Sequence, residues 1–364
     1  MKSMRCPTLT DLPPPPPGKI GWPWTEESPQ LPDTMPDGSA WPRVSIVMPS
    51  YNQGQFIEET IRSVLLQGYP DLEYAIMDGG SSDGSVDIIR KYEPWLASWC
   101  SEQDNGQADA INKGWQRATG DLLGWINSDD ILTPGSIATA VRYLKEHPHV
   151  GFVFGDLERI DAQGRRFGLT TYKEFDLLEI VKNAGWISQP GNLFRRTVFE
   201  RVGPLDISLH FMMDFDYWLR AGLVCQFGYL RLPLARFRRH EEAKSTTKTY
   251  LAAHDVLAVY RKFFGRPDLP ADLMAIRQRA WAGAHLYAAI AWYCGNHLSS
   301  ARAELWAALR CDAGMILRRP FWRILPRTLF ATLVGSRDSR VYQFARVVCR
   351  RGSSRHKLST RTQP

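Results

Sequence analysis

Short apolar runs alternate with helix-like segments from Val44 onward, and this alternation limits the fold more than any other feature of the sequence. Residues 44–48 form a β-branched apolar run, and 56–67 follow with apolar residues at helical spacing and Gly68 as a stop. The unit then repeats, with strands predicted at 72–77, 96–100 and 122–126 and helices at 85–92, 107–118 and 135–146. Such a βαβ series predicts an α/β fold with a mostly parallel sheet and helices on both faces.

The segments outside this series predict two further parts. A strand at 152–154 is followed by two runs, 157–160 and 165–169, that flank a turn and predict a hairpin. Beyond about residue 251 the chain becomes helical and aromatic, and 280–293 and 300–309 suggest a helical pair. We therefore predict an N-terminal extension over 1–42, an α/β domain over 43–250 and a helical, basic C-terminal region over 251–364.

The N-terminal extension is rich in proline, which prevents helix formation. We expect it to lie extended against the domain that follows. The alternative is that the polyproline run at 13–17 docks a partner.

The excess positive charge of the chain is concentrated near its C-terminal end. Residues 314–364 carry twelve Lys or Arg and one acid, a local charge of +11, so the remainder of a chain with net charge +7 is about −4. The basic pI therefore gives no reason to expect a nucleic-acid partner. The six cysteines are scattered without a Cys-x-x-Cys pair, which favours a reducing compartment.

The C-terminal region also bears on membrane contact. No secretory signal is visible, and the uncharged, largely apolar stretch 280–295 is shorter than the ~20 apolar residues of a spanning helix. Residues 341, 344, 345, 348 and 349 form an apolar stripe, and aromatic residues at 321–330 are interleaved with arginines. This pattern is typical of a segment on an anionic membrane surface, so we expect a cytoplasmic protein, peripheral at the inner face of the membrane. The alternative is a helix docked on the protein with its arginines in water.

Polar or glycine-rich turns follow three of the predicted strands: 49–52 (PSYN), 78–84 (DGGSSDG) and 127–130 (NSDD). Each turn alone is compatible with an ordinary strand-to-helix connection. Because the carboxyl ends of parallel strands meet at one edge of the sheet, the three together indicate a ligand site.

These segments also carry a resemblance. Residues 44–52 (VSIVMPSYN), 78–85 (DGGSSDGS) and 127–130 together resemble the family 2 glycosyltransferases with the GT-A fold, and 106–114 (GQADAINKG) resembles a stretch typical of its bacterial members. The similarity runs from about residue 43 to residue 245. It implies a GT-A-type catalytic domain that transfers a sugar, with inversion, from a nucleotide diphosphate donor to a hydroxyl of a glycan or lipid-linked acceptor. Bacterial cell-envelope polysaccharide assembly is the expected setting by analogy.

The resemblance assigns the nucleoside contacts. Pro49, Tyr51 and Asn52 would contact the nucleoside, and Asp78 would accept a hydrogen bond from a base N–H. A carboxylate at that place favours uridine and therefore a UDP donor. The alternative for Asp78 is a cap of the turn before the predicted helix at 85–92.

The resemblance also implies a metal. The 127–130 turn falls where the family has its Asp-x-Asp motif, so Asp129 would bind Mg²⁺ or Mn²⁺ and help to neutralise the leaving diphosphate. Asn127 and Ser128 would bind the nucleotide. Asn127 stands in place of the usual first acid, which removes one negative charge and is expected to weaken metal binding.

Two later segments complete the implied site. Asp214 matches the family's general base, although Met213 replaces the Glu that usually precedes it; the alternative is that Asp214 and Asp216 only favour the start of a helix. In the segment that resembles the family's closing loop, His240 would complete the metal shell. Arg239 and Lys244 would offset phosphate charge, with a solvated basic loop as the alternative. Residues 189–192 lie where acceptor-facing residues occur, without an assigned role.

Two other functions compete with this hypothesis. A sugar-phosphate nucleotidyltransferase also uses a nucleotide-binding α/β sheet and a divalent metal, but the PSYN turn lacks a glycine-rich triphosphate loop. A degenerate nucleotide-sugar-binding module is suggested by Asn127 and Met213, whereas the retained Asp78, Asp129 and Asp214 argue against it.

Overall fold

The structure is a computed structural model that describes residues 4–241, 243 and 249–330. It divides into two compact units. The first comprises Met1–Ile180 with Gly185–Ala243, and the second comprises Val181–Ala184 with Lys244–Pro364. The first unit is built on one sheet, and the described part of the second is helical.

The sheet of the first unit has the strand order β3-β2-β1-β4-β8-β6-β9-β5, with β7 beside β6. Its first half is the predicted βαβ series. β1 (Val44–Ser50) pairs in parallel with β2 (Leu72–Asp78) and β4 (Leu122–Trp125), and β2 pairs in parallel with β3 (Ser98–Ser101). The four carboxyl ends therefore lie at the same edge of the sheet.

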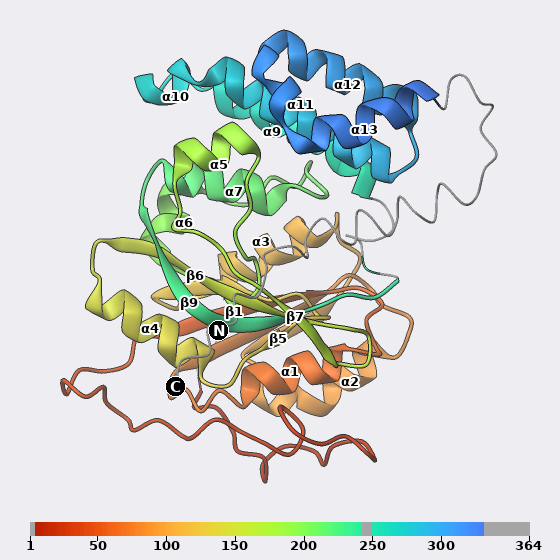
Figure 1. Cartoon of the computed structure of the whole chain (residues 1–364). Helices are drawn as coiled ribbons and strands as arrows, with labels where there is room; N and C mark the ends of the chain where they lie inside the picture. The colour runs from red at the N-terminus through yellow and green to blue at the C-terminus, as the bar shows by residue number, and fades with distance from the viewer. Residues whose placement is uncertain (1–3, 242, 244–248, 331–364) are drawn as a thin grey trace, which may run out of the picture. The chain divides into compact units, whose positions relative to one another are not determined.

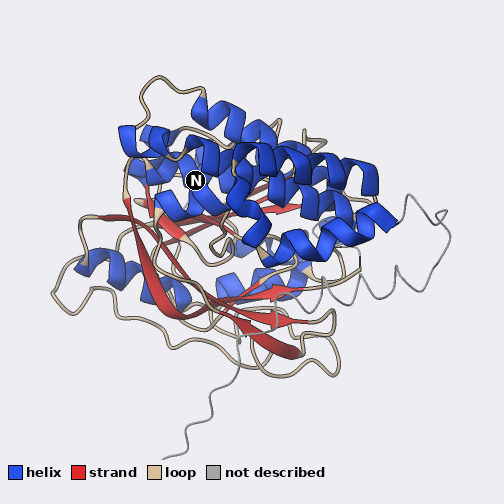
Figure 2. Ribbon diagram, turned by 45° about the horizontal axis from the view of Figure 1, so that its top comes forward, coloured by secondary structure: helices blue, strands red, loops and turns tan. Residues whose placement is uncertain are grey.

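The other half of the sheet is largely antiparallel, so the sheet as a whole is mixed. β8 (Leu193–Arg195) runs antiparallel to β4 and β6 (Val150–Ile160), and β5 (Ile131–Leu132) runs antiparallel to β9 (Gln226–Arg238). Only β6 and β9 pair in parallel in this half of the described sheet. Figure 2 shows the strands twisting across the unit.

The predicted hairpin is present as β6 and β7 (Arg166–Thr170). The strand predicted at 152–154 is not separate, because it continues into the first arm of the hairpin. Register shifts at residues 155–157 keep the backbone paired with β9 through this stretch. A local irregularity in the ladder thus replaces the break that the sequence pattern suggested.

Helices cover both faces of the sheet, as predicted (Figure 1). α1 (Ile57–Leu65) and α2 (Ser85–Tyr92) lie on one face, and α3 (Gln107–Arg117) lies on the other. A Cβ at Gly114 of α3 would lie 2.5 Å from a methyl carbon of Val47, so the glycine allows α3 to approach β1 closely. The remaining helical segments of this unit are η1 (Glu93–Trp95), α4 (Ser136–Glu146), α5 (Leu177–Asn183, which continues into the second unit), α6 (Arg196–Val202) and α7 (Met213–Gly222).

The N-terminal extension has no helix among its described residues and packs against the sheet domain, as expected. The Arg62 guanidinium of α1 is buried and donates to the carbonyls of Pro13 (2.8 Å), Pro23 (3.0 Å) and Trp24 (3.1 Å). The Trp22 indole N–H donates to the Leu132 carbonyl. The extension therefore belongs to the core of the first unit.

The second unit confirms the predicted helical pair, formed by α11 (Arg277–Cys294) and α12 (Leu298–Cys311). Its core contains Leu286 of α11 and Leu305 of α12 among alanines. The other described elements are η2 (Thr249–Leu251), α9 (Ala252–Phe264), α10 (Ala271–Ala275), η3 (Ala313–Leu317) and α13 (Arg319–Phe330). Within the described part of the chain, every helix is too short or too polar to cross a bilayer. The apolar stripe predicted at 341–349 lies outside the described residues.

Candidate active site

Hydrogen bonds join the turns at the carboxyl ends of β1 and β2. The Asn52 backbone N–H donates to the Ser81 hydroxyl (2.8 Å), and the Ser82 N–H donates to the Asn52 side-chain carbonyl (3.0 Å). Asn52 has a φ of 50°, a left-handed conformation that asparagine tolerates better than most residues. The two turns predicted to hold a nucleoside therefore form one structure.

The turns after β3 and β4 extend the same edge. The Ser101 hydroxyl at the end of β3 donates to Asp78 Oδ2 (2.7 Å). The Gln107 side-chain amide at the start of α3 donates to Asn127 Oδ1 (2.6 Å). The structure thus brings the sequence-predicted turns together into a continuous rim.

Asp78 is almost completely buried in this rim, with an exposed fraction of 1%. Its Oδ2 accepts from the backbone N–H groups of Gly80 (3.1 Å) and Ser81 (2.8 Å) in addition to Ser101, and its Oδ1 accepts from the Ser81 hydroxyl (2.6 Å). Asp78 therefore fixes its own turn and keeps one lone pair of Oδ1 for a further donor. Its contact with a base stays a prediction.

A different acid, Asp83, binds the first residue of the helix that follows: its Oδ1 accepts from the N–H (3.1 Å) and hydroxyl of Ser85. Burial raises the pKa of Asp83, but its hydrogen bonds from Ser85 and Gly54 outweigh that effect and lower it. Of the other predicted nucleoside contacts, Pro49 is buried at the end of β1, whereas Tyr51 is 62% exposed at the rim.

The turn after β4 sends its two acids in different directions. Asp130 is fully buried, and its carboxylate accepts from the Arg238 backbone N–H (3.1 Å) and the Asn127 amide (3.3 Å). Burial, and then the charge of Asp129, raise the pKa of Asp130 well above its usual range. Asn127 also donates to the Gln189 side chain (2.8 Å). Asp129 is left as the acid of this turn that faces solvent, with 22% of its side chain exposed.

His240 reaches Asp129 from the residues after β9. Its Nε2 lies 3.1 Å from Asp129 Oδ2, and its ring packs on Phe56 with 4.6 Å between centroids. The Nδ1 atom of His240 is buried and has no hydrogen-bond partner among the described residues. The two side chains that the resemblance assigns to a metal are therefore neighbours.

The donor set fits a partial cation shell. Among residues 4–241, 243 and 249–330, no cluster of three or more His, Cys, Asp or Glu side chains is arranged to hold a metal ion. Mg²⁺ and similar ions are commonly bound by one or two carboxylates, with substrate phosphates and water completing the shell. Asp129 supplies one such carboxylate, His240 would add an imidazole nitrogen beside it, and the remaining positions would be left for a diphosphate and water.

Asp214 lies in the first turn of α7. Its Oδ1 accepts from the backbone N–H of Phe215 (2.7 Å), and the side chain is partly buried. The next turn of the helix packs on β4 through Tyr217 and Trp125, whose ring centroids are 6.4 Å apart. Since Trp125 stands two residues before Asn127, this packing fixes α7 relative to the rim.

Asp216, the second acid of that turn, has a different environment. It is buried and forms an ion pair with Arg220 (2.7 Å), which also donates to the carbonyls of Val202 (2.8 Å) and Pro204 (3.0 Å). Asp216 therefore holds the loop before α7 in place, and Asp214 alone of the two remains a candidate base.

The residues predicted to face the diphosphate are only partly described. Arg239 is exposed, and its backbone N–H donates to the Ile160 carbonyl (2.9 Å). Lys244 lies outside the described residues, so both roles stay predictions. Two residues without a sequence-predicted role, Gln107 and Gln189, hold Asn127 through their side-chain amides, and Gln189 belongs to the 189–192 segment.

The comparison with known proteins identifies the family. The sequence profile of glycosyl transferase family 2 matches residues 45–203. An uncharacterized glycosyltransferase of Mycobacterium tuberculosis is 31% identical over 199 residues, which cover 54% of this chain and 75% of that protein. The chain belongs to glycosyl transferase family 2. A second relative of this glycosyltransferase, the PGL/p-HBAD biosynthesis glycosyltransferase of Mycobacterium bovis, is 28% identical over 185 residues, covering 50% of this chain and 70% of that one.

Solved structures share the fold of this glycosyltransferase. Residues 1–349 of TarS from S. aureus align with a TM-score of 0.52 and 16% identity, over 76% of this chain and 91% of that one. The mannosyltransferase PcManGT from Pyrobaculum calidifontis aligns with a TM-score of 0.51 and 21% identity, over 84% and 91%. At these identities the likeness shows the fold alone, and it confirms the predicted GT-A-type architecture.

Proposed function

We propose that this glycosyltransferase transfers a sugar from a UDP-sugar to a hydroxyl of a glycan or lipid-linked acceptor, with inversion at the anomeric carbon and with Mg²⁺ or Mn²⁺. The observation that carries the proposal is the 3.1 Å approach of His240 Nε2 to Asp129 Oδ2 at the rim where four strands end. A carboxylate and an imidazole so placed suit a cation that also binds a diphosphate.

The donor class is supported by what two structures of similar fold bind. TarS has been solved in complex with UDP-GlcNAc, and PcManGT in complex with GDP-Man and Mn²⁺. Because these two proteins bind different bases, the preference for uridine rests on this chain alone. The remaining lone pair of Asp78 Oδ1 would accept from a base N–H, and the exposed Tyr51 ring offers a surface for the base.

The chemistry assigned to the chain is a single displacement. Asp214 takes the proton of the acceptor hydroxyl while the acceptor oxygen attacks the anomeric carbon and the bond to the diphosphate oxygen breaks. Attack from the opposite face inverts that carbon. When bound, the divalent cation supplies charge neutralisation for the leaving diphosphate. Arg239 and Lys244 are the proposed additional cations for the phosphates.

A panel of nucleotide sugars tests the proposal. Release of nucleoside diphosphate is measured for UDP-, GDP- and dTDP-sugars, with Mn²⁺ and with a chelator, for the wild type and Asp214→Asn. We expect release from UDP-sugars that needs the metal and falls in the variant. Pyrophosphate release from a nucleoside triphosphate would instead favour the nucleotidyltransferase, and donor binding without any release would favour the binding module.

We also propose that the enzyme is cytoplasmic and meets an anionic membrane surface through its second unit. Ile316, Leu317 and Trp322 are exposed by 43%, 85% and 55%, and the Trp322 N–H donates to the Ile316 carbonyl (2.6 Å). The exposed Arg319 and Arg323 stand beside Trp322 in α13. Exposed apolar side chains together with arginines favour an anionic lipid interface, where a lipid-linked acceptor of cell-envelope assembly would be found.

Vesicle co-sedimentation tests the membrane proposal. We expect binding to vesicles that contain phosphatidylglycerol, and at least a tenfold weaker binding for a Leu317→Gln, Trp322→Gln double variant. Ile20→Gln is the matched control, because Ile20 is 80% exposed in the first unit. Equal binding of the double variant and the wild type would overturn this proposal without affecting the proposed reaction.

A further inference from the structure

The buried face of α1 and the turn directly after it carry polar side chains that bind the backbone of the segment after β4. Thr60, Ser63 and Gln67 are all buried. The Ser63 hydroxyl accepts from the Leu132 N–H (3.1 Å), and the Gln67 amide donates to the Thr133 carbonyl (3.0 Å). Of these three side chains, Thr60 is the one whose partners belong to the turn that contains Asp129.

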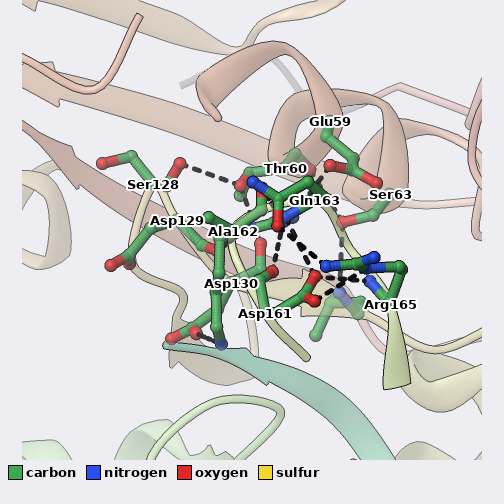
Figure 3. Close-up of polar contacts among 12 residues, drawn as sticks. Glu59, Thr60, Ser63, Ser128, Asp129, Asp130, Asp161, Ala162, Gln163 and Arg165 are labelled. Atoms are coloured by element: carbon green, nitrogen blue, oxygen red, sulfur yellow. Dashed lines mark hydrogen bonds and ion pairs between the residues drawn. The ribbon is translucent and has the colours of Figure 1, made fainter. Parts of the chain in front are cut away.

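Thr60 holds the carbonyls on either side of Asp129. Its Oγ1 lies 3.0 Å from the Ser128 carbonyl oxygen and 2.7 Å from the Asp130 carbonyl oxygen, and it shares its proton between them (Figure 3). A hydroxyl in this position pulls both neighbouring peptide oxygens toward α1. The backbone on both sides of Asp129 is therefore held against α1.

Arg238 holds the remaining carbonyl of the turn. Its Nε donates to the Asp129 carbonyl (2.9 Å), and its Nη1 donates to the carbonyls of Asp161 (3.2 Å) and Ala162 (3.3 Å) in the β6–β7 turn. The guanidinium is 1% exposed, and among the described residues its carboxylate partner is Glu59, at 2.8 Å. Glu59 precedes Thr60 in α1, so the helix both holds the turn and neutralises the arginine.

Arg238 is also connected to His240 through the ring of Phe56. The Arg238 guanidinium lies 4.8 Å from the centroid of the Phe56 ring, and that ring packs on the His240 imidazole. Every carbonyl from Ser128 to Asp130 thus accepts a hydrogen bond from Thr60 or Arg238, and the Asp129 carboxylate lies 3.1 Å from the His240 imidazole.

We infer that Thr60 and Arg238 are positioning residues that fix the Asp129 turn for cation and diphosphate binding. The inference rests on the proposed function, because Asp129 is the proposed cation ligand. It predicts that losing the Thr60 hydroxyl weakens cation binding even though Thr60 touches neither cation nor substrate. Arg238 acts on the same turn through its side chain and is neutralised by Glu59.

Mn²⁺ binding tests the inference without relying on turnover. The free-ion electron paramagnetic resonance signal of Mn²⁺ is titrated with protein in the presence of UDP, for the wild type, Thr60→Val and Thr60→Ser. Valine has the shape of threonine without the hydroxyl, and serine restores it. We expect Thr60→Val to weaken Mn²⁺ binding about tenfold and Thr60→Ser to stay within about threefold of the wild type.

Ser63→Ala is the matched control, because it removes a buried hydroxyl one turn further along α1 whose two partners, the Leu132 N–H and the Thr60 carbonyl, both lie outside the Asp129 turn. We expect it to lower the melting temperature as Thr60→Val does while leaving Mn²⁺ affinity unchanged. Equal affinities of wild type and Thr60→Val, or equal losses in Thr60→Val and Ser63→Ala, would overturn the positioning role. A wild type that binds no Mn²⁺ with UDP would instead overturn the metal site of the proposed function.

Arg238 is tested by Glu59→Gln, which keeps the side-chain shape and removes the charge beside the guanidinium. We expect weaker Mn²⁺ binding than in the wild type at equal folded fraction, measured by near-ultraviolet circular dichroism. If the variant folds and binds Mn²⁺ as tightly as the wild type, Arg238 does not need Glu59 to hold the turn, and this part of the inference fails.

Discussion

The imidazole of His240 and the carboxylate of Asp129 meet at 3.1 Å although 111 positions separate them in the chain. β9 produces this contact, because it pairs with β5 and β6 and ends at Arg238, two residues before His240. Arg238 then bonds to the Asp129 turn through both its backbone and its side chain. The end of β9 is therefore part of the site as much as the turn after β4.

Replacing Asp129 with Asn should lower kcat/KM by about 10²- to 10³-fold, because the amide keeps the size of the side chain but not its charge at the cation. The measurement is nucleoside diphosphate release as a function of Mn²⁺ concentration. Glu102→Gln is the control, since Glu102 is an exposed acid at the same rim that pairs with Lys113 (3.3 Å). Equal losses in both variants would mean that general negative charge at the rim, and not Asp129, matters.

Asp214→Asn should lower kcat by about 10²- to 10⁴-fold with little change in the KM for the donor. An amide does not take up the proton that the hydroxyl of the acceptor substrate loses. Asp216→Asn supplies the contrast. It weakens the ion pair with Arg220 and is expected to lower the melting temperature more than kcat. Steady-state kinetics together with thermal unfolding separate the two effects. A kcat that is unchanged in Asp214→Asn would remove Asp214 from the proposed reaction.

Arg62→Met should destabilise the first unit by about 2–4 kcal/mol, because the carbonyls of Pro13, Pro23 and Trp24 would lose a buried donor. Urea unfolding measures the change. Arg90→Ala, which breaks an exposed pair with Asp87, should cost at most about 0.5 kcal/mol. Similar small values for both variants would show that the N-terminal extension adds little to stability.

The hydrogen bonds of Glu73 predict how the stability of the first unit changes with pH. Burial raises its pKa, but hydrogen bonds from Ser45 (2.6 Å) and from the Thr119 hydroxyl and N–H (2.8 Å) outweigh burial and lower it. The ionised carboxylate therefore stabilises the fold above its ordinary pKa of 4.5, and this contribution is lost as the pH falls further. We expect Glu73→Gln to be less stable than the wild type at pH 7, with the gap in melting temperature closing below about pH 4.5. A gap that stays constant from pH 7 to pH 4 would contradict this assignment.

Much of the first half of the sheet was predictable because its signals are local. The apolar run at β1, the helical spacing in α1 and the polar turns at the strand ends are each readable within about ten residues. The mixed second half was not, since β8 and β9 enter the sheet through pairings with strands distant in sequence. The sequence pattern also predicted two strands where the structure has the single strand β6. Gly155 and Asp156 are paired with β9, which is distant in sequence, and this pairing makes the strand continuous.

The sequence by itself determined the family, the turns of the rim and the residue types for cation and proton chemistry, because these depend on short motifs with fixed spacing. Only the tertiary structure decided which side chains of those motifs face the site. Asp130 is buried and Asp129 is not, since the Arg238 N–H binds the Asp130 carboxylate and the Thr60 hydroxyl binds the Asp130 carbonyl, both from outside the motif. Hydrogen bonds between residues far apart in the chain determine which of these side chains face the site. Such contacts cannot be predicted from the local sequence pattern.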